Sequence, residues 1–331
     1  MSVDGYVATR DLAVAELREG DRFVLATHEH PDGDALGSLA AMQLILTALG
    51  KDAVSYMSPL EFPLPYEYRW LQLDRLVREP PPDYADRTIV FLDCGNIDRN
   101  PADAFKRDGT HIVNIDHHHD NTRFGTVNHV VPDASCTAEI VWDLAQALDV
   151  PLTREIAEAL YVGLVTDTGK FMYENTGVRA HLMAADLIAA GVDNHSVYRR
   201  LYEGVPQGKL DLLARALSKV QRLDGGLVTV TELGLQDFAE AGADESYSEG
   251  VIDHLRSLEG TAIAALVRER MTENERGRFK VSLRAADDRV DVSVIARELG
   301  GGGHRRAAGA TTDLEFAELV AFLRRAAAEQ L

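Results

Sequence analysis

Residues 22–38 read RFVLATHEHPDGDALGS and contain a strand, a loop and the start of a helix. Residues 22–26 form an apolar run, which is typical of a buried strand. Asp34 then opens a predicted helix that extends to about Leu49 and ends at Gly50. The polar loop between the two elements follows the carboxyl end of a strand, which is where open α/β folds bind their ligands.

The order of strand and helix continues outward from this stretch through the first half of the chain. Apolar runs predict further strands at residues 52–57, 88–92 and 111–115, and a short edge strand at 125–131. Helical periodicity follows at residues 137–148, 153–165 and 178–190. Short strands that alternate with helices predict a parallel sheet covered by helices.

The second half of the chain has a different pattern. Residues 191–224 are helical and rich in charge, and we interpret them as a linker. Strands are then predicted at residues 227–231, 261–269 and 279–285, followed by a helix at 292–299, four glycines at 300–303 and a last helix. We therefore predict an α/β protein with an N-terminal parallel-sheet domain (1–190), a helical linker (191–224) and a smaller C-terminal α/β domain with a mixed sheet (225–331).

Length and composition limit the class of protein. The chain has 331 residues, 46% of them apolar and 26% charged, which suits two soluble globular domains. No apolar run is long enough to span a bilayer, the N-terminus has no signal-peptide pattern, and two cysteines make no disulfide framework. These features lead us to expect a cytoplasmic protein.

The charge balance bears on the substrate. Lys and Arg number 34 against 53 Asp and Glu, which gives a net charge of −19. Such a surface repels long polyanions, because affinity for nucleic acid comes mainly from the neutralisation of phosphates by cationic side chains. A small phosphorylated substrate in a local basic pocket is compatible with this charge, whereas processive degradation of long DNA fits it poorly.

Candidate metal ligands follow apolar elements in four separate segments. These residues are His28, Asp32 and Asp34 after the first predicted strand, Asp93 after the third, Asp116, His117, His118 and His119 after the fourth, and Asp167 at the end of a helix. Each has an ordinary structural alternative, such as a helix cap for Asp34 or a hydrogen-bonded polar residue at the end of an element. Since parallel strands end at a common edge, their coincidence predicts a metal site.

These motifs resemble those of a known family. The segment HEHPDGDALGS, then Asp93, then DHH at residues 116–118 with Asn121 behind it, then GLVTDTG at 163–169 resemble the four motifs of the DHH phosphoesterase superfamily in order. GGGGHRRAAG at residues 300–309 resembles the signature of the DHH-associated C-terminal domain. The resemblance covers nearly the whole chain and points to the stand-alone oligoribonuclease and pAp phosphatase branch. RecJ-type exonucleases share the motifs but carry additional nucleic-acid-binding modules.

The resemblance implies a dinuclear metal site. His28 and Asp32 would bind one metal, Asp34 and His117 the other, and Asp93 and Asp167 would be shared. It implies two Mn²⁺ per chain, with Mg²⁺ as the alternative, and carboxylates mixed with imidazoles agree with that choice.

Two such metals suit an in-line attack on phosphorus by a bridging hydroxide. Catalytic roles are implied for Asp93, Asp116 and His118, with His118 stabilising charge or assisting the leaving group. Cys94 beside Asp93 could be taken for a nucleophile, but a small buried cysteine is the commoner case.

Substrate binding is expected in the C-terminal domain. Arg284 resembles the family's substrate-contacting arginine, and glycines such as Gly301, Gly302 and Gly303 can present backbone N–H groups to a phosphate. His304, with Arg305 and Arg306, adds local positive charge. A glycine run alone is also typical of a loop or a helix C-cap.

The predicted function is hydrolysis of short oligoribonucleotides (nanoRNA) and of pAp. The alternative within the class is a phosphodiesterase for cyclic-di-AMP or linear dinucleotides. An inorganic polyphosphate or pyrophosphate hydrolase is disfavoured by the GGGGH segment. The alternative of another class is a non-catalytic, metal-dependent nucleotide-binding regulator. The expected partners are short oligoribonucleotides, pAp or dinucleotides, with no long nucleic acid and no membrane; a homodimer is left open.

Overall fold

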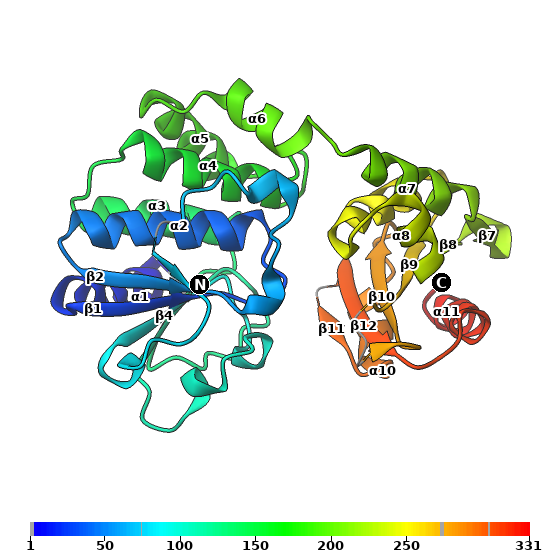
Figure 1. Cartoon of the computed structure of the whole chain (residues 1–331), viewed down its shortest axis with the longest axis horizontal. Helices are drawn as coiled ribbons and strands as arrows, with labels where there is room; N and C mark the ends of the chain where they lie inside the picture. Colours follow the sequence, from blue (N-terminus) through cyan, green and yellow to red (C-terminus); the bar gives the residue numbers. More distant parts are fainter. Residues whose placement is uncertain (1–2, 74, 272–274, 304) are drawn as a thin grey trace. The chain divides into compact units, whose positions relative to one another are not determined.

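The computed structural model describes residues 3–73, 75–271, 275–303 and 305–331. The chain divides into two compact units, Met1–Glu203 (unit 1) and Gly204–Leu331 (unit 2) (Figure 1). None of the helices in the described part of the chain is both long and apolar enough to cross a membrane.

Unit 1 is built on a six-stranded parallel sheet with the order β3-β2-β1-β4-β5-β6. Its strands are β1 (Arg22–Ala26), β2 (Asp52–Tyr56), β3 (Leu76–Val77), β4 (Thr88–Leu92), β5 (Ile112–Asp116) and β6 (Val127–Val130). The predicted parallel sheet is confirmed, and β1 and β4 match the predicted strands residue for residue. Strand order reverses between β1 and β4, and such a switch point is where ligands bind in open α/β sheets.

The two faces of this sheet are covered differently. Phe23 and Leu25 enter a large core beneath the helices, whereas Val24 and Ala26 face a smaller core with Phe105, which lies in a short 3-10 turn. The helices are α1 (Val3–Glu19), α2 (Gly33–Ala48), α3 (Thr137–Ala147), α4 (Arg154–Asp167), α5 (Val178–Ala189) and α6 (Asn194–Tyr202). Helix α2 lies against the sheet, with α4 and α5 stacked beyond it (Figure 1).

Two glycines let α2 and α4 touch through their backbones. A Cβ atom on Gly37 would lie 2.5 Å from the carbonyl oxygen of Ala159 and 2.9 Å from the nitrogen of Gly163. A Cβ atom on Gly163 would lie 2.7 Å from Oδ1 of Asp34. The contact brings the first turn of α2 and the last turn of α4 to the same edge of the sheet.

Unit 2 contains a six-stranded sheet with the order β11-β12-β10-β9-β8-β7. It is mixed, as the sequence predicts. Its strands are β7 (Gln221–Leu223), β8 (Val228–Leu233), β9 (Ile263–Glu269), β10 (Phe279–Ala285), β11 (Gly302–Gly303) and β12 (Ala307–Thr312). Strands β8 and β9 are parallel and the other pairs are antiparallel.

Helices cover both faces of the second sheet. They are α7 (Gln207–Ser218), α8 (Leu235–Ala241), α9 (Val251–Arg256), α10 (Val292–Glu298) and α11 (Phe316–Gln330). The first three pack on one face and the last two on the other. The segment 191–224, predicted to be a helical linker, contributes α6 to unit 1 and both α7 and β7 to unit 2.

The glycine run contributes a strand of its own. Gly302 pairs with Gly309 and Gly303 with Ala308. A Cβ atom on Gly301 would lie 2.1 Å from the carbonyl oxygen of Gly309, and Gly303 has a φ of 134°. These two glycines are therefore required by the close approach of β11 to β12, apart from any role in binding.

Candidate metal centre

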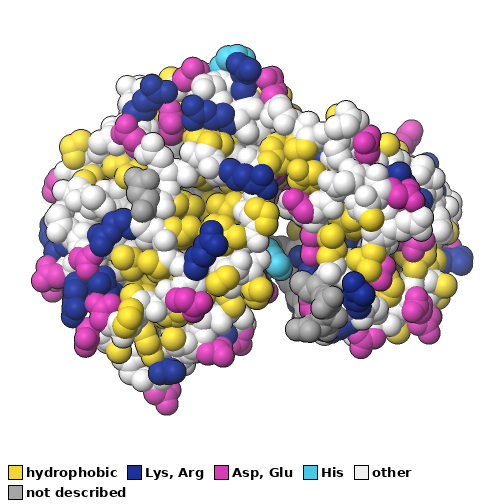
Figure 2. All heavy atoms as spheres, viewed as in Figure 1, with side chains coloured by type: hydrophobic (Ala, Val, Ile, Leu, Met, Phe, Trp, Pro, Cys, Tyr) yellow, Lys and Arg dark blue, Asp and Glu magenta, His cyan; other side chains and the backbone are white. Residues whose placement is uncertain are grey.

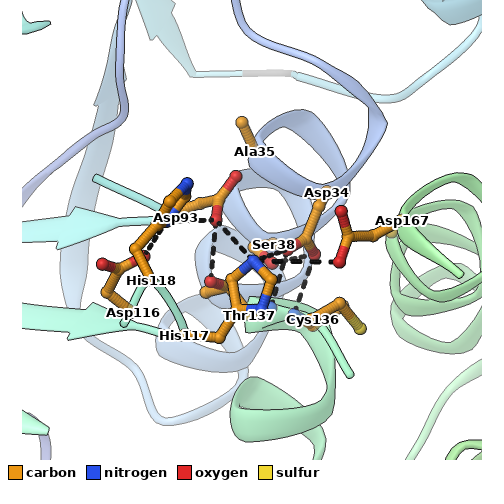
Figure 3. Close-up of polar contacts among 12 residues, drawn as sticks. Asp34, Ala35, Ser38, Asp93, Asp116, His117, His118, Cys136, Thr137 and Asp167 are labelled. Carbon is orange, nitrogen blue, oxygen red and sulfur yellow. Dashed lines mark hydrogen bonds and ion pairs between the residues drawn. The ribbon is translucent and has the colours of Figure 1, made fainter. Parts of the chain in front are cut away.

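Histidine and aspartate side chains gather at the carboxyl edge of the first sheet (Figure 3). Three groups have ligand atoms within 4.8 Å of one another: Asp93, His117 and His118; His28, Asp32 and Asp93; and Asp34, His117 and Asp167. The groups overlap at Asp93 and His117. All six residues expected to bind metal lie in this cluster, together with His118, whereas His119 lies in none of the three groups.

Asp93 occupies the centre of the cluster. Its φ of 56° is rare for a residue other than glycine and places the carboxylate just beyond the end of β4. Oδ2 lies 3.6 Å from Nε2 of His28, and Oδ1 lies 3.7 Å from Nε2 of His117. Burial favours the neutral acid, but the imidazoles of His28, His118 and His117 around the carboxylate outweigh it and lower the pKa of Asp93. Asp93 is therefore held as a carboxylate that faces imidazoles on both sides.

The backbone orients the ring of His28 as a metal ligand requires. Its Nδ1 lies 2.7 Å from the carbonyl oxygen of Glu29, a distance at which Nδ1–H donates a hydrogen bond. Nε2, the ring nitrogen left for a metal, faces the Asp93 carboxylate at 3.6 Å. A backbone partner on the second ring nitrogen is the usual way in which proteins orient a metal-binding histidine.

His117 lies between the two carboxylate-rich sides of the cluster. Figure 3 shows it with Asp93 on one side and Asp34 and Asp167 on the other. Its Nε2 is 4.0 Å from Oδ2 of Asp34 and 3.8 Å from Oδ2 of Asp167. These separations are longer than direct hydrogen bonds, and they leave room for an ion among the side chains.

The ionised forms of Asp34 and Asp167 are destabilised by their surroundings. Burial, followed by the charges of Asp93 and Asp167, raises the pKa of Asp34 well above its ordinary value. Burial raises the pKa of Asp167 to about 7, and the charges of Asp32 and Asp93 act in the same direction. The neighbouring His117 opposes this rise. A divalent cation removes this repulsion, and carboxylate oxygens with imidazole nitrogens suit Mn²⁺ or a similar metal. The residues present therefore fit the metal that the motifs imply.

Asp34 does not cap helix α2, although its position in the sequence allows that role. Asp32, not Asp34, caps α2, because its Oδ1 accepts hydrogen bonds from the N–H groups of Asp34 and Ala35 at 3.0 and 3.1 Å. Asp34 instead accepts from the N–H groups of Thr137 and Ala138, at 2.6 and 2.9 Å, and so joins α2 to the start of α3. Asp34 is thus a buried site residue rather than a helix cap.

His118 forms a charged pair with Asp116 (Figure 3). Its Nδ1 donates to Oδ1 of Asp116 at 2.7 Å, and the side-chain amide of Asn121 donates to Oδ2 at 2.6 Å. Burial opposes protonation of His118, but the hydrogen bond to Asp116 and the charge of Asp93 raise its pKa to about 9. His118 is therefore a cation at neutral pH, with Nδ1 3.6 Å from Oδ1 of Asp93.

Sequence reasoning missed two residues that hold the cluster together. The hydroxyl of Thr137 donates to Oδ1 of Asp93 at 3.0 Å, across 44 positions in the sequence. The side-chain amide of Asn175 lies 3.1 Å from Oδ2 of Asp167 and 2.8 Å from the carbonyl oxygen of Ser135. Neither belongs to a motif, although Thr137 could be suspected from its place at the start of a predicted helix.

Cys94 does not have the properties of a nucleophile. Its thiol donates to the carbonyl oxygen of Asn96 at 3.1 Å, and burial raises its pKa to about 12. A reactive cysteine requires the thiolate, which this environment disfavours.

The expected substrate-binding residues lie in unit 2. Arg284 is half-buried on β10, between Ala264 of β9 and Ala307 of β12. Gly302 faces open space and has no positive φ, so the packing of the chain gives no reason for glycine there. Arg306 pairs with the carboxylate of Asp288, which offsets part of its charge, whereas Arg305 donates to the backbone carbonyl oxygen of Asp288. His304 lies outside the described residues.

The chain is similar to known proteins in both sequence and structure. Residues 22–164 match the DHH family, N-terminal domain, and residues 225–329 match the DHHA1 domain. The "Bifunctional oligoribonuclease and PAP phosphatase NrnA" of Thermus thermophilus is 37% identical over 292 residues, 87% of this chain and 83% of that protein. The "Cyclic-di-AMP phosphodiesterase GdpP" of Geobacillus thermodenitrificans is 27% identical over 94% of this chain but only 48% of that protein.

Among solved structures, an exopolyphosphatase-related protein from Bacteroides fragilis has a similar fold. The TM-score is 0.85 at 24% identity, over 98% of this chain and 96% of that one. This likeness confirms the α/β fold that the sequence predicts.

Proposed function

Because this chain belongs to the DHH family, we propose that it is a metal-dependent phosphoesterase that hydrolyses short oligoribonucleotides and the phosphomonoesters of pAp. The observation that carries the proposal is the chain of three ligand groups, in which Asp93 joins the first to the second and His117 joins the first to the third. The relative from Thermus thermophilus, which matches over most of both chains, supports the substrate class. The direct test is release of phosphate from pAp and of mononucleotides from dinucleotides in the presence of Mn²⁺.

Two divalent cations, of which we favour Mn²⁺, would be held at the edge of the sheet in unit 1. His28 and Asp32 would bind one, Asp34 and His117 the other, and Asp93 and Asp167 would be shared. When bound, such a pair lowers the pKa of water and offsets the charge on phosphoryl oxygens. The like-charge repulsion among the buried carboxylates supports this assignment.

The chain's own groups hold the reacting atoms and a proton. Asp116 keeps the His118 imidazole oriented and protonated, so His118 can donate to the oxygen that leaves phosphorus. Thr137 fixes the Asp93 carboxylate through Oδ1. Cys94 takes no part, since its thiol stays protonated, and no covalent intermediate is needed.

Unit 2 would supply substrate binding. The guanidinium of Arg284 donates to the carbonyl oxygen of Leu283 and donates to no carboxylate among the described residues. Gly302 would allow a phosphate to approach the backbone closely, as would its neighbours Gly301 and Gly303, and His304 is proposed from its motif alone. In this proposal, unit 1 carries the catalytic metal-binding residues and unit 2 carries the substrate-binding residues.

Arg284→Ala is expected to raise KM for pAp by about 10- to 100-fold, because one charge-assisted contact with a phosphate is lost. The kcat should change by less than about threefold, and bound metal should stay the same, since Arg284 is not a ligand. Steady-state kinetics and metal analysis measure both. Arg278→Ala is the matched control, because Arg278 precedes β10 and pairs with Asp313. Loss of metal in the Arg284 variant would refute this separation of roles.

Catalytic efficiency is expected to fall steeply for RNAs longer than about five nucleotides, fewer than many single-strand grooves cover. The net charge is −19, and the Lys and Arg side chains coloured in Figure 2 are scattered among Asp and Glu rather than gathered in one track. End-labelled RNAs from dimer to twenty-mer, compared by kcat/KM at fixed salt, measure the effect. Equal or rising efficiency on the longest RNA would favour a RecJ-like exonuclease over the proposed substrate class.

The second candidate is a phosphodiesterase for cyclic or linear dinucleotides. It is favoured by the 27% identity to the cyclic-di-AMP phosphodiesterase, although this chain spans about half of that protein. Cyclic-di-AMP assayed beside its linear product and pAp separates the two candidates. A non-catalytic regulator is disfavoured, since every expected ligand position carries a ligand residue.

A further inference from the structure

Arg99 lies beside the metal centre but belongs to none of its motifs. It ends the 3-10 turn Ile97–Arg99, six residues after Asp93, and its side chain is exposed. The backbone holds it in place, because the carbonyl oxygen of Arg99 accepts a hydrogen bond from the N–H of Glu29 at 2.7 Å. Its Nη2 lies 3.2 Å from Nδ1 of His28. The guanidinium is therefore one imidazole ring away from the ligand nitrogen of His28.

The contact between Arg99 and His28 is not a hydrogen bond when His28 serves as a ligand. Nδ1 of His28 then carries the hydrogen that it donates to the carbonyl oxygen of Glu29. A guanidinium has five donors and no acceptor, so two donors face each other across this contact. In the described part of the chain, no carboxylate or carbonyl oxygen accepts from the Arg99 side chain. Its donors are left available to an anion at the centre.

The charge of the metal centre indicates which kind of phosphate ester would benefit most from a contact with Arg99. The carboxylates of Asp32, Asp34, Asp93 and Asp167 would balance two divalent cations and leave no net positive charge for the substrate. A phosphodiester brings one negative charge on its phosphoryl group, whereas a phosphomonoester brings up to two.

We propose that Arg99 binds the charged oxygen that a reacting phosphomonoester has and a phosphodiester replaces with an ester oxygen. Arg99 would thereby determine how well this site hydrolyses pAp relative to dinucleotides. In a dinucleotide the corresponding oxygen is an ester oxygen that carries a nucleoside and no charge. It is therefore a weak hydrogen-bond acceptor for the guanidinium. The inference rests on the proposed function and specifies which of its two substrate classes depends on Arg99.

The test compares Arg99→Ala with the wild-type protein on pAp and on a linear dinucleotide, both with Mn²⁺. We expect kcat/KM to fall about 100-fold for pAp and less than about threefold for the dinucleotide, as expected for one charged contact. The affinity of the Mn²⁺-loaded protein for inorganic phosphate, measured by calorimetry, should fall at least about tenfold. Metal content should be unchanged.

Two further variants sharpen the comparison. Arg99→Lys should recover part of the pAp activity, because it keeps the charge but loses the planar fork of donors. Arg107→Ala is the control, since Arg107 is an exposed cation of the same unit that lies over the ring of Tyr84. It should resemble wild type on both substrates.

Three outcomes would overturn the role of Arg99. They are equal losses on both substrates, loss of metal from the Arg99→Ala protein, and unchanged affinity for inorganic phosphate. A wild-type protein inactive on both substrates would refute the proposed function instead. In that case the phosphate affinities of the wild-type and Arg99→Ala proteins would still decide whether Arg99 binds a phosphoryl group.

Discussion

Asp93→Asn is expected to lower kcat/KM for pAp by about 10³-fold or more. Asp93 belongs to two of the three ligand groups, and its carboxylate faces His28 and His117 from between them. Asparagine keeps the shape and an oxygen for Thr137 but removes the charge that binds the cations. Loss of a group that only supports a metal ligand costs about 10- to 100-fold in metal affinity, and loss of a shared ligand should exceed that.

Two measurements accompany this variant. Metal content after dialysis should fall below that of wild type, and thermal unfolding should show that the protein is folded. Asp103→Asn is the matched control, because Asp103 lies in the same unit with a side chain that is 95% exposed. Wild-type activity in the Asp93 variant would remove the residue from the centre of the mechanism.

Removal of metal is expected to abolish turnover, with a loss of about 10³-fold or more, because no group in the cluster can activate water as a divalent cation does. Mn²⁺ added after removal of the chelator should restore the rate, whereas buffer alone should not. Full activity in a thoroughly metal-free sample would refute the metal-dependent mechanism.

The same experiment has a pH dependence of known sign. In the metal-free protein the pKa of Asp167 is raised to about 7, so below that pH a proton competes with the cation. Mn²⁺ should therefore restore activity at a concentration about tenfold lower at pH 8 than at pH 6. An Mn²⁺ requirement that is independent of pH would show that Asp167 does not bind the metal.

Much of unit 1 could be predicted because its signals are local. Strands β1 and β4 are uninterrupted apolar runs, and their carboxyl ends meet at one edge by the geometry of a parallel sheet. That geometry brings His28, Asp93 and His117 together. Helix α1 was not predicted, since its apolar residues are not concentrated on one side.

The elements and contacts that the sequence does not predict depend on residues far away in the sequence. Strands β11 and β12 consist of glycine, alanine and threonine, and pairing with β10 rather than strand propensity forms them. In the site, Asn175 reaches Asp167 only because the loop after α4 folds back. Arg99 reaches His28 because the turn after β4 packs against the loop after β1. Such contacts have no signature in the spacing of residues.

The measurement that tests the central claim most directly is anomalous scattering at the manganese edge from crystals grown with Mn²⁺. The cluster around Asp93 is predicted to show two peaks, one beside His28 and Asp32 and the other beside Asp34 and His117. Each should lie within about 2.3 Å of its ligand atoms, the usual range for bonds from nitrogen and oxygen ligands to such metals. Crystals with catalytically competent protein and no peak at this cluster would contradict the account.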